Sequence, residues 1–145
     1  MIREARYEEL GALLQLYLDL HETEIPAHSP NLRETWNDIL QDKNHHLILD
    51  EVDGQLVSSC VCVVIPNLTR GVRPYAVIEN VVTRKGCRGK GYATECLAYA
   101  QEIAEERHCY KMMLLTGSKN PDTLKFYEHA GYNRTDKTAF IRWLK

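Results

Sequence analysis

The sequence lacks the features of several large classes of protein. No run in its 145 residues approaches the ~18 consecutive apolar residues that a membrane-spanning helix needs. The first ten residues, MIREARYEEL, have no apolar stretch of the kind found in a signal peptide. The net charge is −2, so the basic excess typical of nucleic-acid binding is also missing. We therefore expect a cytoplasmic protein that binds neither nucleic acid nor membranes.

Cysteine and histidine occur, but without the spacing that disulfides or metals require. The five cysteines are odd in number and form no CxxC pair, which predicts reduced thiols packed in or near a core. The six histidines include the pair His45-His46, but no HxxxH or HExxH motif is present. We expect no metal site.

Hydrophobic periodicity predicts alternating strands and helices within a single domain, residues 1–145, that has no internal repeat. The expected strands are 2–5, 46–51, 55–65, 75–83, 112–116 and 138–143, and the expected helices are 8–20, 32–42, 91–107 and one that begins near 121. The order βααβββαβαβ indicates an α/β (α+β) fold in which helices flank one mixed central sheet.

A glycine-rich stretch, CRGKGYATE from Cys87 to Glu95, joins an expected strand to an expected helix. The first turn of a helix has unpaired N–H groups and a partial positive charge, and glycines let an anion approach them. Arg88 and Lys90 add positive charge, so the stretch predicts a diphosphate-binding loop. GxxxxGK(S/T) is absent and Thr94 breaks GxGxxG, which argues against the two common nucleotide loops. Taken alone, the stretch is also compatible with a solvated turn.

Three segments in the same order resemble one family. Arg88-x-x-Gly91-x-Ala93 matches the pattern Gln/Arg-x-x-Gly-x-Gly/Ala of the GCN5-related N-acetyltransferase (GNAT) superfamily. Residues 79–83, ENVVT, resemble its fourth strand, and residues 120–132, with FYEHAGY, resemble its later N…FYExxGF segment. The resemblance implies the GNAT fold, with two splayed strands that hold acetyl-CoA, and acetyl transfer to an amine.

The resemblance also assigns roles to residues. The co-substrate acetyl-CoA would lie with its diphosphate on the glycine-rich loop and its pantetheine arm beside the fourth strand. The residues implied are Val81, Val82, Thr83, Arg88, Gly89, Lys90, Gly91, Tyr92, Ala93 and Asn120.

Two side chains are candidates for proton transfer. Glu79 precedes the backbone that would hold the acetyl group, so it is the expected general base, directly or through water. It is also compatible with a role in orienting the ammonium group or bonding the sheet. Tyr127 would protonate the departing thiolate, although a tyrosine there is also typical of core packing.

The acceptor is the least defined part of the prediction. We expect its walls to come from residues 21–33 and 66–75, and we expect Arg70, Arg73 and Tyr75 to contact it. Two arginines suggest an acceptor that also carries a carboxylate or phosphate, unless they are solvated or lie near CoA. The function predicted is N-acetylation of a small-molecule or peptide amine. The alternative is a non-catalytic acyl-CoA-binding module, and a homodimer is an expected partner because dimers are common in the family.

Overall fold

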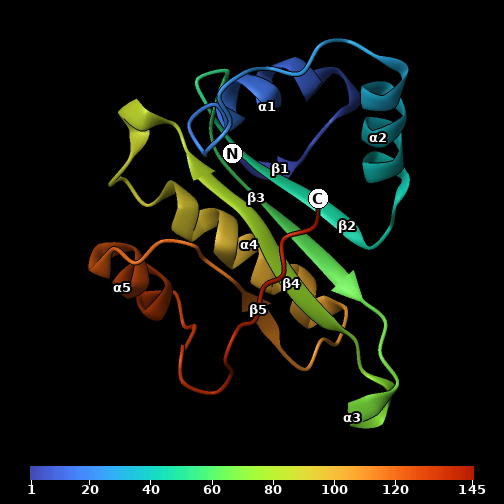
Figure 1. Ribbon diagram of the computed structural model, residues 1–145, viewed down its shortest axis with the longest axis vertical. Coiled ribbons are helices and arrows are strands. Elements are labelled where there is room, and N and C mark those ends of the chain that lie inside the picture. Colours follow the sequence, from blue (N-terminus) through green and yellow to red (C-terminus); the bar gives the residue numbers. More distant parts are fainter.

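A five-stranded sheet organises the computed structural model, which describes residues 1–145 (Figure 1). The strands are β1 (Ile2–Glu4), β2 (His45–Val52), β3 (Gln55–Ile65), β4 (Tyr75–Thr83) and β5 (Met112–Leu114). They lie side by side in chain order, antiparallel from β1 to β4 and parallel between β4 and β5. The mixed sheet predicted from the sequence is confirmed.

Helices cover both faces of this sheet. They are α1 (Leu10–Tyr17), α2 (Pro30–Gln41), α3 (Thr69–Val72), α4 (Tyr92–Glu106) and α5 (Pro121–His129), with short 3₁₀ turns η1 (Tyr7–Glu9) and η2 (Lys85–Cys87). One core packs α1 and α2 on one face, and a second packs α4, with α5 beside it, on the other. In Figure 1 these two groups of helices lie on opposite sides of the strands. None of the helices is long and apolar enough to cross a bilayer.

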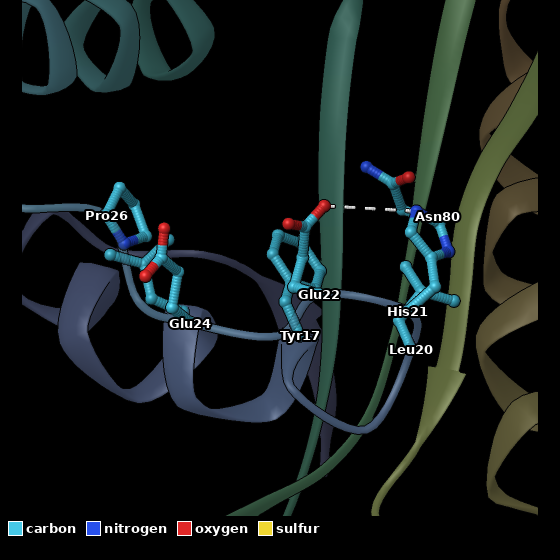
Figure 2. Close-up of a pocket in the computed structure, with 8 residues that line it drawn as sticks. Tyr17, Leu20, His21, Glu22, Glu24, Pro26 and Asn80 are labelled. Carbon is cyan, nitrogen blue, oxygen red and sulfur yellow. Dashed lines mark ion pairs between the residues drawn. The ribbon is translucent and has the colours of Figure 1, made fainter.

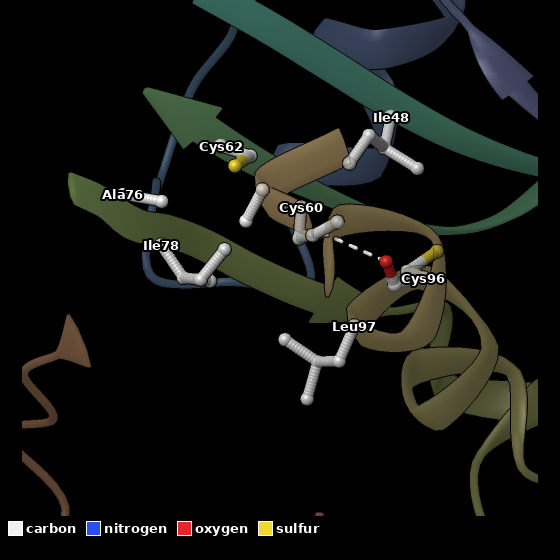
Figure 3. Packing of buried hydrophobic residues seen from close by; sticks show 9 residues of the cluster. Ile48, Cys60, Cys62, Ala76, Ile78, Cys96 and Leu97 are labelled. Atoms are coloured by element: carbon white, nitrogen blue, oxygen red, sulfur yellow. Dashed lines mark hydrogen bonds between the residues drawn. The ribbon is translucent and has the colours of Figure 1, made fainter. Parts of the chain in front are cut away.

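The core under α4 is built from small and medium side chains, as Figure 3 shows. Its fully buried members are Ile48, Cys60, Cys62, Ala76, Ile78, Cys96, Leu97, Ala100 and Ala104. Small residues on α4 let its backbone approach the sheet, and the Cys60 thiol donates to the Cys96 carbonyl at 3.6 Å. Burial raises the pKa of the Cys62 and Cys96 thiols to about 12, so both stay protonated. All five cysteines are free, as predicted.

Helix starts follow local capping chemistry. The Ser29 hydroxyl accepts a hydrogen bond from the Leu32 amide at 3.1 Å, and Pro30 occupies the first helical position. This cap starts α2 two residues before the position predicted from periodicity. At α5 the predicted cap is confirmed, because the Asn120 side chain accepts from the Asp122 amide at 2.9 Å.

The last expected strand, residues 138–143, is wrong for this chain. Residues 133–145 are all exposed and form no helix or strand. The last backbone–backbone hydrogen bond along the chain is from the Tyr132 amide to the Tyr127 carbonyl. Alternating apolar residues give the segment strand propensity, but a strand also needs a neighbour for its backbone groups. The segment finds none within its own chain.

Candidate active site

A β-bulge in β4 directly follows Glu79, the expected general base. Glu79 pairs with Val61 on β3, but Val82 pairs with Ser59, so Cys60 alone faces Asn80 and Val81. Asn80 takes the left-handed conformation, with φ of 51°, which asparagine tolerates better than most residues. The extra residue shifts the alternation of the β4 side chains by one residue and interrupts the regular pairing of β4 with β3.

The bulge also changes which side chains face which helices. Before it, Ala76 and Ile78 pack under α4; after it, Val81 lies on that face and Val82 packs beneath α1 and α2. Glu79 and Asn80 both line the cavity on the α1–α2 face. Two consecutive polar side chains therefore enter one cavity, which a regular strand would not allow.

An opening between β4 and β5 begins at the same place. The parallel pairing covers only Ala76 with Met112 through Ile78 with Leu114. From Glu79 onward, the edge of β4 that faces β5 has no strand partner, so its backbone groups are not paired within the sheet. On the other edge the Val82 carbonyl is already bonded to the Ser58 hydroxyl at 2.8 Å. Residues 81–83 thus present one free edge to a ligand that lies between the strands.

The glycine-rich loop forms a concave donor surface at the end of β4. Gly89 and Gly91 have φ of 78° and 88°, and Gly91 is the N-cap of α4. The amides of residues 88–91 donate no hydrogen bond within the protein, and the first turn of α4 has no intrahelical acceptor for its own. A Cβ at Gly91 would meet no atom within 4 Å. These observations fit a bound diphosphate, which would take up the free donors.

Asp19 holds this loop in place, a role that the sequence did not suggest. Its carboxylate accepts from the Lys85 amide at 3.1 Å, and its carbonyl accepts from the Arg88 guanidinium at 3.1 Å. Arg88 also donates to the Thr83 carbonyl at 3.4 Å. The Arg88 cation is therefore fixed beside the loop, whereas the exposed Lys90 makes no such contact.

Tyr127 lies on the opposite face of the sheet from Glu79. It comes from α5 and packs against the core under α4, with its ring 5.1 Å from Phe126 and 6.5 Å from Tyr132. Burial raises its pKa, so the phenol keeps its proton at neutral pH. Asn120, at the start of the same helix, uses its side-chain oxygen as the cap and leaves the amide nitrogen free.

Two adjacent cavities lie on the Glu79 side and share Leu14, Tyr17 and Asn80. The larger, of about 430 Å³, lies between α1, α2 and the sheet, and ten of its fourteen lining residues are apolar. The other, of about 400 Å³, is bounded by the segment after α1, where Glu22 and Glu24 lie in a row below Asn80 (Figure 2). Burial raises the pKa of Tyr17 to about 12, against the opposing effect of the Asn80 side chain. Of the predicted walls, residues 21–33 contribute to these cavities.

The structure does not bring Arg70, Arg73 and Tyr75 to these cavities. Arg73 donates to the carbonyls of His108 and Cys109 at 3.1 and 3.0 Å, and Arg70 stacks 5.3 Å from the Tyr110 ring. Tyr75 begins β4, four residues before Glu79, and also packs against Tyr110. Their predicted role in acceptor binding stays a prediction, with the three side chains held at the far end of the strand.

The free amides at the start of α4 thus lie on the segment that follows β4, the strand that separates from its parallel neighbour β5. The sequence matches the Acetyltransferase (GNAT) family over residues 10–132. The chain belongs to this family of acetyltransferases, whose members use acetyl-CoA.

Individual proteins that are similar to this chain are also named as acetyltransferases. A solved structure, a putative acetyltransferase from Agrobacterium tumefaciens str. C58, is 34% identical, with a TM-score of 0.90 over 99% of both chains. A glucosamine 6-phosphate N-acetyltransferase from Trypanosoma brucei brucei is 32% identical over 84 residues, which span 58% of this chain and 55% of that protein. An aminoglycoside N(6')-acetyltransferase type 1 from Serratia marcescens is 25% identical over 89% of this chain and 91% of its own length.

Proposed function

We propose that the chain transfers the acetyl group of acetyl-CoA to the primary amine of a small molecule by direct attack. The observation that carries this proposal is the bulge at Asn80, because it turns Asn80 into the α1–α2 cavity beside Glu79, at the point where β4 and β5 separate. Acetyl-CoA bound between those strands, with its diphosphate on residues 88–93, would present its thioester to that cavity. The free edge of residues 81–83 would then donate to the thioester oxygen.

The first chemical task is to deprotonate the amine. An alkyl amine with a pKa of ~10.4 is only about 0.04% neutral at pH 7, so reaching the neutral form costs roughly 4.6 kcal/mol. The Glu79 carboxylate attracts the ammonium group and accepts its proton, directly or through water. The neutral nitrogen forms a bond to the thioester carbon. As the tetrahedral intermediate collapses, the C–S bond breaks and the nitrogen releases its second proton to water.

The second task is to stabilise the leaving thiolate. Tyr127 lies on the α4 face, the opposite side from the amine, where the sulfur of a cofactor threaded between the strands would emerge. Its half-buried phenol is protonated and gives its proton to the sulfur, and solvent then returns a proton to the phenolate. The products are the N-acetylated amine and CoA. This arrangement needs no covalent enzyme intermediate, and Cys87 in the loop has no part in it.

The cavities also define the acceptor that we propose. Trp36 is fixed by a hydrogen bond from its indole N–H to the Tyr7 carbonyl at 2.9 Å, so the apolar wall is already formed. Glu79, with Glu22 and Glu24 in the adjoining cavity, makes the polar side acidic. This combination suits an amine that is carried on an apolar body and is cationic as a whole, better than one that also carries an anion.

The test is an initial-rate assay of CoA release with matched acceptors. The comparison sets an arylalkyl amine against an equally long polar amine, an aminoglycoside and glucosamine 6-phosphate. We expect the arylalkyl amine or the polycation to give the highest kcat/KM, and Glu79→Gln to lower it. Tight binding of acetyl-CoA without turnover of any amine would favour the alternative, a non-catalytic binding module.

A further inference from the structure

Tyr17 lies where the two cavities on the Glu79 side meet. It is the last residue of α1, and Leu14 lies one turn before it on the same side of that helix. These two side chains and Asn80 line both the larger and the smaller cavity, and no other residue lines both. Two neighbouring side chains of α1 and one of β4 therefore form the wall between the cavities.

The two sides of this wall differ in chemical character. The larger cavity is lined mostly by hydrophobic residues, and Glu79 is one of its few polar residues. In the smaller cavity only three of the eight lining residues are hydrophobic, and Glu79 is not among them. Figure 2 shows its carboxylates, Glu22 and Glu24, on the segment that follows Tyr17. An acceptor that filled both cavities would therefore need an apolar part near the reacting amine and a second cation beyond the wall.

Packing holds the wall in place. Leu13 and Leu16, each directly before one of the two wall residues of α1, are 2% and 0% exposed, which anchors the helix on the sheet. The ring of Tyr17 packs against the same core. Burial raises the pKa of Tyr17 to about 12, so the phenol is neutral at pH 7 and cannot serve as a base there. What Tyr17 contributes to the site is the shape of its ring.

We propose that Tyr17 is a specificity-determining residue, whose ring confines the acceptor to the larger cavity and excludes long polycations. The inference rests on the proposed function, because it assumes that the amine reacts beside Glu79. It narrows the preferred acceptor to the arylalkyl amine. The larger cavity alone, at about 430 Å³, lies within the range of small-molecule sites, roughly 300–1,000 Å³.

Removal of the ring should open the wall. In Tyr17→Ala the two cavities would join into one space that combines their volumes. A long polycation could then place one amine beside Glu79 and a distant one beside Glu22 or Glu24. Tyr17→Phe is the matched control, because it keeps the ring and removes only the hydroxyl group. Leu14→Ala opens the same wall one turn away and is the second test variant.

The kinetic experiment compares three amines in the wild type and the three variants. Phenethylamine is the arylalkyl acceptor, spermine the long polycation, and diaminobutane a short diamine that controls for charge. The wild type and Tyr17→Phe should turn over phenethylamine with a higher kcat/KM than spermine. In Tyr17→Ala and Leu14→Ala, if folded by circular dichroism, the kcat/KM of spermine relative to diaminobutane should rise at least ~10-fold, the lower end of discrimination by a pocket. This rise should come from a lower spermine KM, with the KM of acetyl-CoA unchanged.

A binding experiment separates this inference from the proposed function, because it needs no turnover. In titration calorimetry, Tyr17→Ala should bind spermine at least ~10-fold more tightly than Tyr17→Phe does. That result without turnover of any amine would support the wall and overturn the proposed acetyl transfer. Turnover with the same spermine-to-diaminobutane ratio in the wild type, Tyr17→Ala and Leu14→Ala would overturn the wall alone. A wild type that already prefers spermine to phenethylamine would also overturn it.

Discussion

Gly91→Val tests the diphosphate loop and separates binding from folding. Gly91 has φ of 88°, where a side chain is strained even though no atom lies within 4 Å. A β-branched residue in this region costs about 1–3 kcal/mol of folding free energy, so some loss of stability is expected without any ligand. Gly86→Val is the matched control, because Gly86 lies in the same loop, has equal space and is outside the left-handed region.

The magnitude for binding follows from linkage. At a concentration 100 times its Kd, acetyl-CoA should stabilise the wild-type protein by about 2.7 kcal/mol. If the valine raises Kd tenfold, the same ligand concentration stabilises by only about 1.4 kcal/mol. Gly86→Val should keep the full ligand effect, because Gly86 lies outside residues 88–91, whose amides are the free donors.

The assay is urea unfolding of the three proteins with and without acetyl-CoA, supported by titration calorimetry. Backbone strain alone lowers the unfolding free energy by the same amount with and without acetyl-CoA. Loss of diphosphate binding instead lowers the stabilisation that acetyl-CoA adds. A Gly91→Val protein that is destabilised but gains as much from acetyl-CoA as the wild type would refute the assignment of this loop to the diphosphate.

Four further predictions concern single groups. Tyr127→Phe should lower kcat at least tenfold, because general acids typically contribute ~10²–10⁴-fold, and should leave the KM for acetyl-CoA unchanged. An unaffected kcat would show that Tyr127 is a packing residue. Glu79→Gln should lower kcat/KM most near pH 7 and progressively less toward the pKa of the amine, whereas a higher acceptor KM at constant kcat would indicate orientation only. Arg73→Ala should leave the acceptor KM unchanged, because Arg73 is bonded to the His108 and Cys109 carbonyls; an increase worth ~1.5–3 kcal/mol would restore the anionic acceptor predicted from the sequence. Burial raises the pKa values of Cys60, Cys62 and Cys96 in the folded chain, so the unfolded chain loses these thiol protons first as the pH rises. The unfolding free energy should therefore fall above pH ~8.5, and it should fall less in Cys96→Ala. An unfolding free energy from urea titrations that does not change with pH would contradict this.

Local signals account for the parts of the fold that the sequence predicted well. The bounds of β3 and β4, the start of α5 and the glycine-rich loop depend on alternation, caps and glycines within a few residues of each other. The bulge at Asn80 was not predictable as a feature of this chain alone, because it is defined by the register between β3 and β4. Tyr17 lies within the predicted helix 8–20, but only the packing of that helix against the sheet shows that Tyr17 lines both cavities.

The remaining differences arise where a residue's neighbours come from distant parts of the chain. Arg70 and Arg73 follow Pro66 in a loop that leads to the strand of Glu79, so sequence proximity suggested a shared site. Along an extended strand, four residues from Tyr75 to Glu79 span about 13 Å, and Arg73 donates to the Cys109 carbonyl after α4, so contact between these arginines and the acceptor stays a prediction. The strand propensity of residues 138–143 was real, but propensity does not supply the neighbouring strand.

Glu79 and Tyr127 lie on opposite faces of the sheet, and the point where β4 and β5 separate lies between them. An acceptor amine would reach the gap between β4 and β5 from the α1–α2 cavity, whereas acetyl-CoA would reach it from the side of the glycine-rich loop and α4. Because the two routes are separate, neither molecule would have to leave before the other binds. In the proposed reaction, acceptor and acetyl-CoA would therefore enter and leave independently. Substitutions that reshape the α1–α2 cavity would then leave the glycine-rich loop, the proposed diphosphate site, unchanged.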